Sequence, residues 1–100
     1  MLYKTFLLLL LTTSSLWAQN TAELSGKITD KATQKPLIGA DIYLKELKKG
    51  ANADAQGNYH LKGIPEGNYT IIGSYLGYQT FSKKIYLKGQ ERLDLSLIHI

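Results

Sequence analysis

Residues 54–69 read DAQGNYHLKGIPEGNY, and the triplet Gly-Asn-Tyr occurs in them twice, at 57–59 and at 67–69. Each copy follows a turn signal, Asp54 before the first and Pro65 before the second. In a type I turn Asp is favoured at the first position, Pro at the second and Gly at the fourth. Both segments therefore predict a turn that ends in glycine and begins a strand. Strands that begin about ten residues apart are typical of a small antiparallel sandwich or barrel.

Alternation of apolar and polar residues predicts further strands on both sides of this repeat. Leu24, Gly26 and Ile28 share one face of the first predicted strand. The inward positions of the later strands are Ile42 and Leu44, then Tyr59 and Leu61, then Tyr69, Ile71, Gly73 and Tyr75, then Phe81, Ile85 and Leu87, and finally Leu93, Leu95 and Leu97. No segment after residue 18 shows a helical period. We therefore expect an all-β domain, a small antiparallel Greek-key-type β-sandwich of six to seven strands.

The strand expected from about Asn68 to Leu76 differs from the others. Ile72 and Leu76 place apolar side chains on its second face, so we expect it to be central and covered on both faces. Residues 50–57 are expected to form a polar hairpin region, and Gly77-Tyr78 a bend or bulge that leads into the next strand.

The beginning of the chain has the order of a secretory signal peptide. A short basic start is followed by an apolar run at 6–11 and by the small residue Ala18. The run is interrupted at 12–15, well short of the roughly 20 apolar residues that a spanning helix needs. We expect residues 1–18 to be cleaved, a single domain over 19–100, and no transmembrane segment after cleavage.

Composition narrows the class of protein. The chain has no cysteine, which excludes a lipid-modified N-terminal cysteine and a disulfide framework. About eighty residues after cleavage suffice for one domain held by packing alone. The formal net charge is +4, and the basic residues gather locally at Lys45, Lys48 and Lys49 and at Lys83, Lys84 and Lys88. Nucleic-acid binding needs a denser basic face with interleaved aromatic residues, so these lysines are interpreted as solvated positions that discourage edge-to-edge aggregation.

Residues that carry chemistry are scattered. A catalytic zinc site needs about three protein ligands, and the chain has only His60 and His99, neither near a second histidine. Asp41, Asp54 and Asp94 are too dispersed for a calcium loop. The serines lack a nucleophile elbow. We expect no enzyme activity, no metal and no cofactor.

The tyrosines offer the candidate contacts. Tyr43, Tyr78 and Tyr86 are out of phase with their apolar neighbours or lie at a bend, so we expect them to be exposed and available to stack on a glycan or a partner. Ordinary packing is the alternative, since single exposed aromatic residues are normal. Lys48 and Lys49, in the loop from Lys45 to Gly50, are candidate partner contacts, together with an edge strand that could accept a strand of another protein.

Five blocks in succession carry a family resemblance. They are GKITD at 26–30, PLIGADIYL at 36–44, ADAQGNY at 53–59, IPEGNY at 64–69 and SYLGY at 74–78. In this order and at this spacing the chain resembles the carboxypeptidase regulatory-like domain over about residues 23–97. The resemblance implies a transthyretin-like or prealbumin-like sandwich of seven strands. It does not imply peptidase activity.

The resemblance also implies a cellular setting. Such domains lie beside metallocarboxypeptidase catalytic domains, and very often at the N-terminus of TonB-dependent outer-membrane receptors, between the signal peptide and the plug. We therefore expect export to the periplasm or the periplasmic face of the outer membrane, with a receptor plug, a barrel or periplasmic proteins as partners. The leading hypothesis is a non-catalytic accessory module of such a receptor, whether a separate chain or a fragment of a longer one. A carbohydrate-binding module and a regulatory appendage of a metallocarboxypeptidase are the alternatives.

Overall fold

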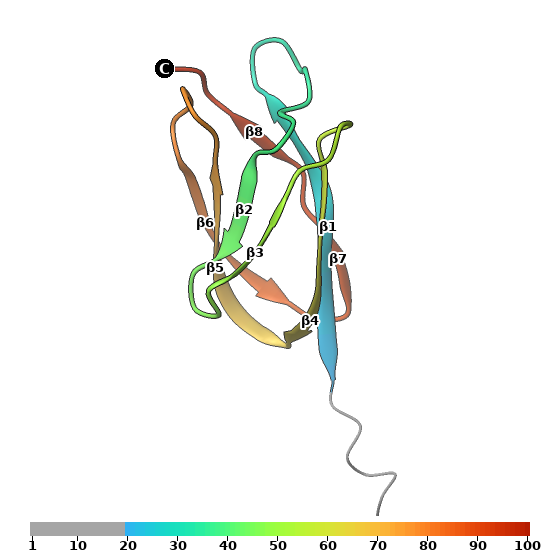
Figure 1. Ribbon diagram of the computed structural model, residues 1–100. Helices are drawn as coiled ribbons and strands as arrows, with labels where there is room; N and C mark the ends of the chain where they lie inside the picture. The colour runs from blue at the N-terminus through green and yellow to red at the C-terminus, as the bar shows by residue number, and fades with distance from the viewer. Residues whose placement is uncertain (1–19) are drawn as a thin grey trace, which may run out of the picture.

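The domain is a sandwich of two β-sheets (Figure 1). The computed structural model describes residues 20–100, so the predicted signal peptide at 1–18 lies outside the described residues. The described strands are β1 (Thr21–Asp30), β2 (Asp41–Leu44), β3 (Lys49–Asn52), β4 (Asn58–Pro65), β5 (Gly67–Ser74), β6 (Phe81–Leu87), β7 (Gln90–Arg92) and β8 (Leu95–Leu97). Over residues 20–100 there is no helix of the length and apolarity that crossing a membrane requires. The predicted all-β sandwich is confirmed, with eight strands in the described part of the chain.

The first sheet is organised around β1. This strand pairs antiparallel with β4 on one side, and on the other side it pairs in parallel with β7 and then with β8. The second sheet has the order β3-β2-β5-β6, and all its pairings are antiparallel. The two parallel pairings, which join the first strand to the last two, were not part of the predicted antiparallel pattern.

The core lies between the two sheets and follows the predicted alternation. Its largest fully buried side chains are Leu24, Ile28, Ile42, Leu44, Ile64, Ile71, Leu87, Leu95 and Leu97. Tyr59 and Tyr69 are also buried, which confirms them as core residues. Each of these large apolar side chains stabilises the fold by about 1.5–3 kcal/mol on burial.

The prediction that the Asn68–Leu76 strand is covered on both faces was wrong. Strand β5 is central, between β2 and β6, but it ends at Ser74. Leu76 lies in the following turn with 96% of its surface exposed, and Tyr75 is exposed as well. Ile72 is only half-buried on the outer face. In residues 20–100 no third layer covers that face of the second sheet, because all the strands belong to the two sheets.

The two copies of Gly-Asn-Tyr begin strands, as predicted, but through different connections. Asp54 builds a turn in which its Oδ1 accepts hydrogen bonds from the backbone N–H groups of Gln56 and Asn58, each at 2.9 Å. Gly57 follows with φ of 82°, a conformation that favours glycine. At the second copy only Glu66 separates β4 from β5, so the chain passes from one sheet to the other within a single residue.

Two elements differ from the sequence-based outline. Residues 49–52, expected within a polar loop region, form β3, which pairs with β2 through a turn at residues 45–48. The last predicted strand is divided into β7 and β8, with Leu93 and Asp94 between them. Both differences concern short segments in which apolar alternation is weak or interrupted.

Candidate functional site

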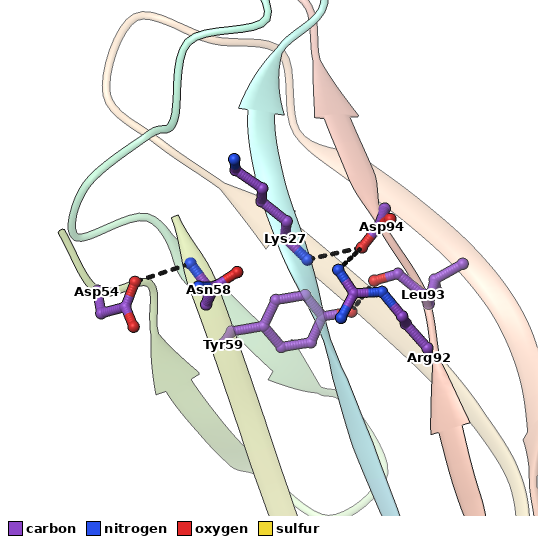
Figure 2. A network of polar contacts seen from close by, with 7 residues as sticks. All are labelled: Lys27, Asp54, Asn58, Tyr59, Arg92, Leu93 and Asp94. Carbon is purple, nitrogen blue, oxygen red and sulfur yellow. Dashed lines mark hydrogen bonds and ion pairs between the residues drawn. The ribbon is translucent and has the colours of Figure 1, made fainter. Parts of the chain in front are cut away.

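The link between β7 and β8 is held by a network of polar contacts from β1 and β4 (Figure 2). Tyr59 extends from β4 past β1, and its hydroxyl donates a hydrogen bond to the carbonyl of Leu93. The backbone N–H of Lys27 donates to Asp94 Oδ1 at 2.8 Å, and Arg92 lies 3.1 Å from the same carboxylate oxygen. Burial raises the pKa of Tyr59, so its hydroxyl stays a donor.

Gly26 is required where it stands because the chain passes so close to it. A Cβ at this position would lie 1.9 Å from the carbonyl oxygen of Leu93. No side chain fits at that distance, which explains physically why the first block of the sequence resemblance begins with glycine. The network fixes β7 and β8 against β1 and gives the first sheet a rigid margin.

One flank of the sandwich, formed by β3 and β4, is closed. Lys49 pairs with Leu44, which is fully buried, so the Lys49 side chain lies on the inner face of the edge strand β3. Its Nζ donates a hydrogen bond to the carbonyl of Lys62 on β4, across the space between the sheets. The adjoining turn is fixed as well, because Glu46 accepts hydrogen bonds from the backbone N–H and the hydroxyl of Thr70 at 2.7 and 2.8 Å. These bonds lower the pKa of Glu46.

The opposite flank, between β6 and the β7–β8 margin, is open. Strand β6 has seven residues and lies at the edge of the second sheet, next to β5 alone. Outside its ladder with β5, no backbone hydrogen bond involves residues 81–87 within the described chain. An edge strand of this kind presents a row of backbone N–H and C=O groups to solvent.

A hollow of about 300 Å³ runs along this open flank. It is lined by Leu24, Lys83, Lys84, Ile85, Tyr86, Leu87, Glu91, Arg92 and Leu93. Its base is apolar, since Leu24 and Leu87 are buried and Ile85 and Leu93 are partly buried against the core. Three of its charged side chains are basic and one is acidic, so the hollow carries net positive charge.

Lys83 occupies the position on β6 that Lys49 occupies on β3. It pairs with Ile71, which is fully buried, so the Lys83 side chain also points to the inner face of its sheet. Unlike the side chain of Lys49, the side chain of Lys83 makes no hydrogen bond or ion pair with any residue between 20 and 100. The open flank therefore contains an inward-facing ammonium group that nothing in the described chain neutralises.

The structure separates the predicted contact residues. Tyr43 and Tyr86 lie on the outer face of the second sheet, Tyr43 half-buried and Tyr86 58% exposed. Lys48 is exposed in the β2–β3 turn with φ of 51°. Lys49 is engaged by the β4 carbonyl. Tyr78 lies in the β5–β6 connection and contacts Asp30 at the end of β1, so the five residues form no common site.

Tyr78 has a structural role that its sequence position did not indicate. Its hydroxyl donates a 2.6 Å hydrogen bond to Asp30 Oδ2, and its ring meets the edge of the His99 ring at a centroid distance of 5.0 Å. The bond to Asp30 raises the pKa of Tyr78. Tyr78 is half-buried and packs against the core, so it does not offer a free stacking surface.

Asp30 was missed by sequence reasoning, although it lies at the end of a strand and before a polar turn. Its Oδ1 accepts hydrogen bonds from the N–H groups of Ala32 and Thr33 at 2.8 and 2.9 Å. The bond from Tyr78, followed by that from Thr33, lowers the pKa of Asp30 to about 2. The signal that could have identified it is an aspartate at the start of a turn, because such a side chain often accepts hydrogen bonds from the backbone two residues further on. The carboxylate ties the end of β1 to the β5–β6 connection.

Within residues 20–100 there is no group of three or more His, Cys, Asp or Glu residues placed to hold a metal ion. His60 is exposed and lies 3.2 Å from Glu23 Oε2, at the surface of the first sheet. The domain has exposed surface side chains and an unpaired strand edge, and both features suit recognition of a partner.

Comparison with known families identifies the domain. The family model of the CarboxypepD_reg-like domain matches residues 24–99, and the chain belongs to this family. The resemblance found in the sequence blocks is thereby confirmed. No curated protein matches the chain.

Solved structures with the same fold come from proteins of several kinds. A type II cohesin–X–dockerin complex of Acetivibrio cellulolyticus matches with a TM-score of 0.66 and 22% identity, over 77% of this chain and 55% of that one. The major pilin subunit of Bacillus cereus matches with a TM-score of 0.65 and 20% identity, over 81% and 31%. Catechol 1,2-dioxygenase from Acinetobacter matches with a TM-score of 0.67 and 13% identity, over 82% and 53%.

These similarities establish the sandwich fold, and they do not indicate an activity. The chain spans about half or less of the length of each of these three structures. One of the three is an enzyme, so the fold is compatible with catalytic and with non-catalytic proteins.

Proposed function

We propose that this domain is a non-catalytic interaction module of the cell envelope, which docks onto a partner protein through β6. The observation that carries the proposal is the open flank: an unpaired seven-residue edge beside a hollow with an apolar base. An exposed edge strand is a template for an added strand, in which main-chain hydrogen bonds give affinity and side-chain pockets give specificity. The predicted use of the Lys45–Gly50 loop has less support, because Lys49 and Glu46 are engaged within the domain.

The setting we propose is that of an accessory domain of a TonB-dependent outer-membrane receptor. Its support is the order of a signal-like start at 1–18 followed by a CarboxypepD_reg-like domain. The partners would then be a receptor plug, a barrel or periplasmic proteins. Mass spectrometry of the native product in envelope fractions tests this setting. Peptides found within a larger outer-membrane protein support it, and peptides found only in the cytoplasmic fraction contradict it.

Site-specific photo-crosslinking tests the docking surface in the cells that make the protein. A photoreactive amino acid replaces Ser82 on β6, and in a matched variant it replaces Lys48 in the β2–β3 turn. Both positions are exposed, so neither replacement disturbs the core. We expect an adduct with an envelope protein from position 82 and none from position 48. An adduct from position 48 alone, or none from either, would contradict docking through β6.

Carbohydrate binding on the outer face of the second sheet is a second candidate, favoured by one observation. Beside Tyr43 lies a hollow of about 320 Å³, whose lining includes the polar side chains of Asp41, Asn52 and Ser74. An aromatic ring next to hydrogen-bonding side chains suits a sugar. Titration calorimetry with glycans found on an array, using Tyr43→Ala and Tyr86→Ala, tests it. Affinity unchanged by both substitutions removes this face as the site.

A regulatory appendage of a metallocarboxypeptidase is the third interpretation of the family membership. It requires a separate catalytic domain, since the described residues hold no metal-binding cluster. Co-purification of a zinc peptidase with the native protein would support this interpretation over the receptor setting.

A further inference from the structure

We infer that the open flank selects one kind of partner: an extended segment that adds to the second sheet next to β6, with inward-facing side chains that are apolar except for one acidic residue opposite Lys83. This inference deepens the proposed function and rests on it, because it specifies the chemistry of the docked strand. Three features of the flank carry it: the free backbone edge, the apolar base of the hollow and the charge of Lys83.

The backbone edge determines the conformation of the partner. Residues 81–87 hydrogen-bond to β5 on one side, and within residues 20–100 no other backbone bonds to them. An added strand satisfies the outward N–H and C=O groups. Its alternate side chains then point toward the space between the sheets, where Ile85 and Leu93 are only partly buried. Apolar side chains at those positions would complete the core of the flank.

Lys83 determines the charge of the partner. Its side chain lies on the inner face, between Phe81 and Ile85 along the strand, and it lines the hollow. Covering the flank removes water from this ammonium group, which is costly unless an opposite charge replaces the water. A carboxylate from the added strand forms a charge-assisted hydrogen bond there. A basic strand would be repelled and an uncharged one would leave the ammonium group without a partner, so the edge discriminates.

The neighbouring charges favour the same partner. Lys84 and Arg92 line the hollow with Lys83, and Glu91 is the one acidic side chain in the lining. Arg92 also forms an ion pair with Asp94 at 3.1 Å, and both side chains are largely exposed. Oppositely charged pairs opposite each other in a ladder stabilise it, and like charges destabilise it. The charges of the flank thus complement an acidic strand.

A second copy of this domain suits the edge poorly. In a symmetric antiparallel pair of β6 strands, a twofold axis at the middle of residues 81–87 would place Lys84 opposite its own copy. A twofold axis moved by one residue along the strand would place Lys83 opposite its own copy. Either arrangement brings like charges together at the centre of the new ladder.

The test uses the native protein purified from cells and a capped nine-residue peptide, Val-Ser-Val-Ser-Glu-Ser-Val-Ser-Val, in which the valines and the single glutamate share one face of the strand. Two control peptides accompany it, one with lysine in place of glutamate and one with alternate backbone amides N-methylated, which cannot pair. Calorimetry measures affinity, and backbone NMR signals locate the binding. We expect the glutamate peptide alone to bind, with the largest shifts in residues 81–87 and small ones in β3. Equal binding of the glutamate and lysine peptides would overturn the inference.

Matched variants test whether Lys83 determines the selectivity. Lys83→Gln should lower the affinity for the glutamate peptide about tenfold or more, which is the loss expected for one desolvated charge pair. Lys49→Gln, on the equivalent position of β3, should leave the affinity unchanged. Lys83→Glu should reverse the preference toward the lysine peptide, a gain that a misfolded variant cannot produce. An unchanged affinity in Lys83→Gln would overturn the role of this residue.

The two levels of the proposal fail differently. A crosslink from position 82 to an envelope protein, without binding of the acidic peptide, refutes the acidic strand and keeps the docking edge. Peptide binding without any crosslink in cells supports the chemistry of the edge and refutes the envelope docking function.

Discussion

The two flanks of this sandwich carry the same residue type in equivalent positions, and they differ in what that residue contacts. Lys49 on β3 and Lys83 on β6 both point inward from an edge strand of the second sheet. Lys49 reaches a carbonyl on β4, whereas Lys83 reaches no described residue. Inward-pointing charges protect edges from indiscriminate pairing. An inward-pointing lysine thus closes a flank when its charge is satisfied within the domain, and on our proposal it makes the flank selective when it is not.

The largest effect is expected from removing the rigid margin beside the open flank. Gly26→Ala places a methyl group 1.9 Å from the carbonyl oxygen of Leu93, so the backbone of β1 or of the β7–β8 link must move. We expect a loss of about 3 kcal/mol or more in the free energy of unfolding. Urea unfolding followed by circular dichroism measures it.

The control for this substitution is Gly89→Ala, between β6 and β7. Gly89 has φ of 63°, and no atom lies within 4 Å of the place that a Cβ would take, so only backbone strain applies. We expect a cost of about 1–2 kcal/mol. Equal losses in the two variants would show that the approach of Leu93 to β1 is loose.

A smaller effect is expected from cutting the bond that ties the two sides of the first sheet. Tyr59→Phe removes the hydroxyl that crosses from β4 to the carbonyl of Leu93, which leaves this acceptor without its partner. We expect a loss of about 1–2 kcal/mol in stability. Tyr86→Phe, at an exposed position, should change stability by less than about 0.5 kcal/mol. Thermal unfolding of both variants decides, and a neutral Tyr59→Phe would contradict a structural role for this bond.

Acid should destabilise the end of the sandwich where Asp30 binds Tyr78. The Lys49 contact on the closed flank should not respond, because it contains no acidic group. The pKa of Asp30 is about 2 in the folded protein, below its ordinary value of 3.8. The unfolded chain therefore takes up this proton first, and the stabilisation present above about pH 4 is lost as the pH falls toward 2. Urea midpoints between pH 5 and 2 should fall more steeply for the unsubstituted protein than for Asp30→Asn. Parallel curves would contradict this assignment.

The smallest change in stability, and the sharpest contrast in behaviour, is expected from the two lysines. Lys83→Met and Lys49→Met each change the free energy of unfolding by less than about 1 kcal/mol, because both side chains are exposed. Lys83→Met joins Phe81 and Ile85 into an unbroken apolar row on a free edge, so it should self-associate. Lys49→Met should not, because β3 is short and faces β4. Sedimentation velocity over a range of concentrations measures this, and self-association of both variants would remove the distinction between the flanks.

Periodicity in the sequence was enough to predict the core, because a strand with one buried face must alternate. Ile42, Leu44, Tyr59 and Leu61 are buried as predicted. Strand β3 was not predicted because Gly50 and Asn52 carry no apolar signal, and its pairing with β2 alone defines it. The exposure of Leu76 had the opposite cause: its apolar character suggested cover that the described fold does not supply.

The candidate site was beyond a sequence-based prediction for a different reason. Whether Lys49 and Lys83 differ depends on which strand lies across the gap, and that is set by the order of strands in two sheets. Tyr78 was assigned to a surface because the residue that binds its hydroxyl, Asp30, is far away in sequence. Contacts of this kind become visible only when the topology is known.

The parallel pairing of β1 with β7 and β8 has a consequence for how the domain forms. Ile28 meets Leu95 and Glu23 meets Gln90, so the first strand completes its ladder only with the last segments of the sandwich. Such sequence-distant pairs lose the entropy of loop closure before they gain contacts, and folds built from them form in milliseconds to seconds. A chain that emerges from a translocation channel N-terminus first would keep β1 half-paired until residue 97 has crossed. In the exported setting that we propose, translocation and folding of this domain would therefore be sequential, because the first sheet is incomplete until its final strand arrives.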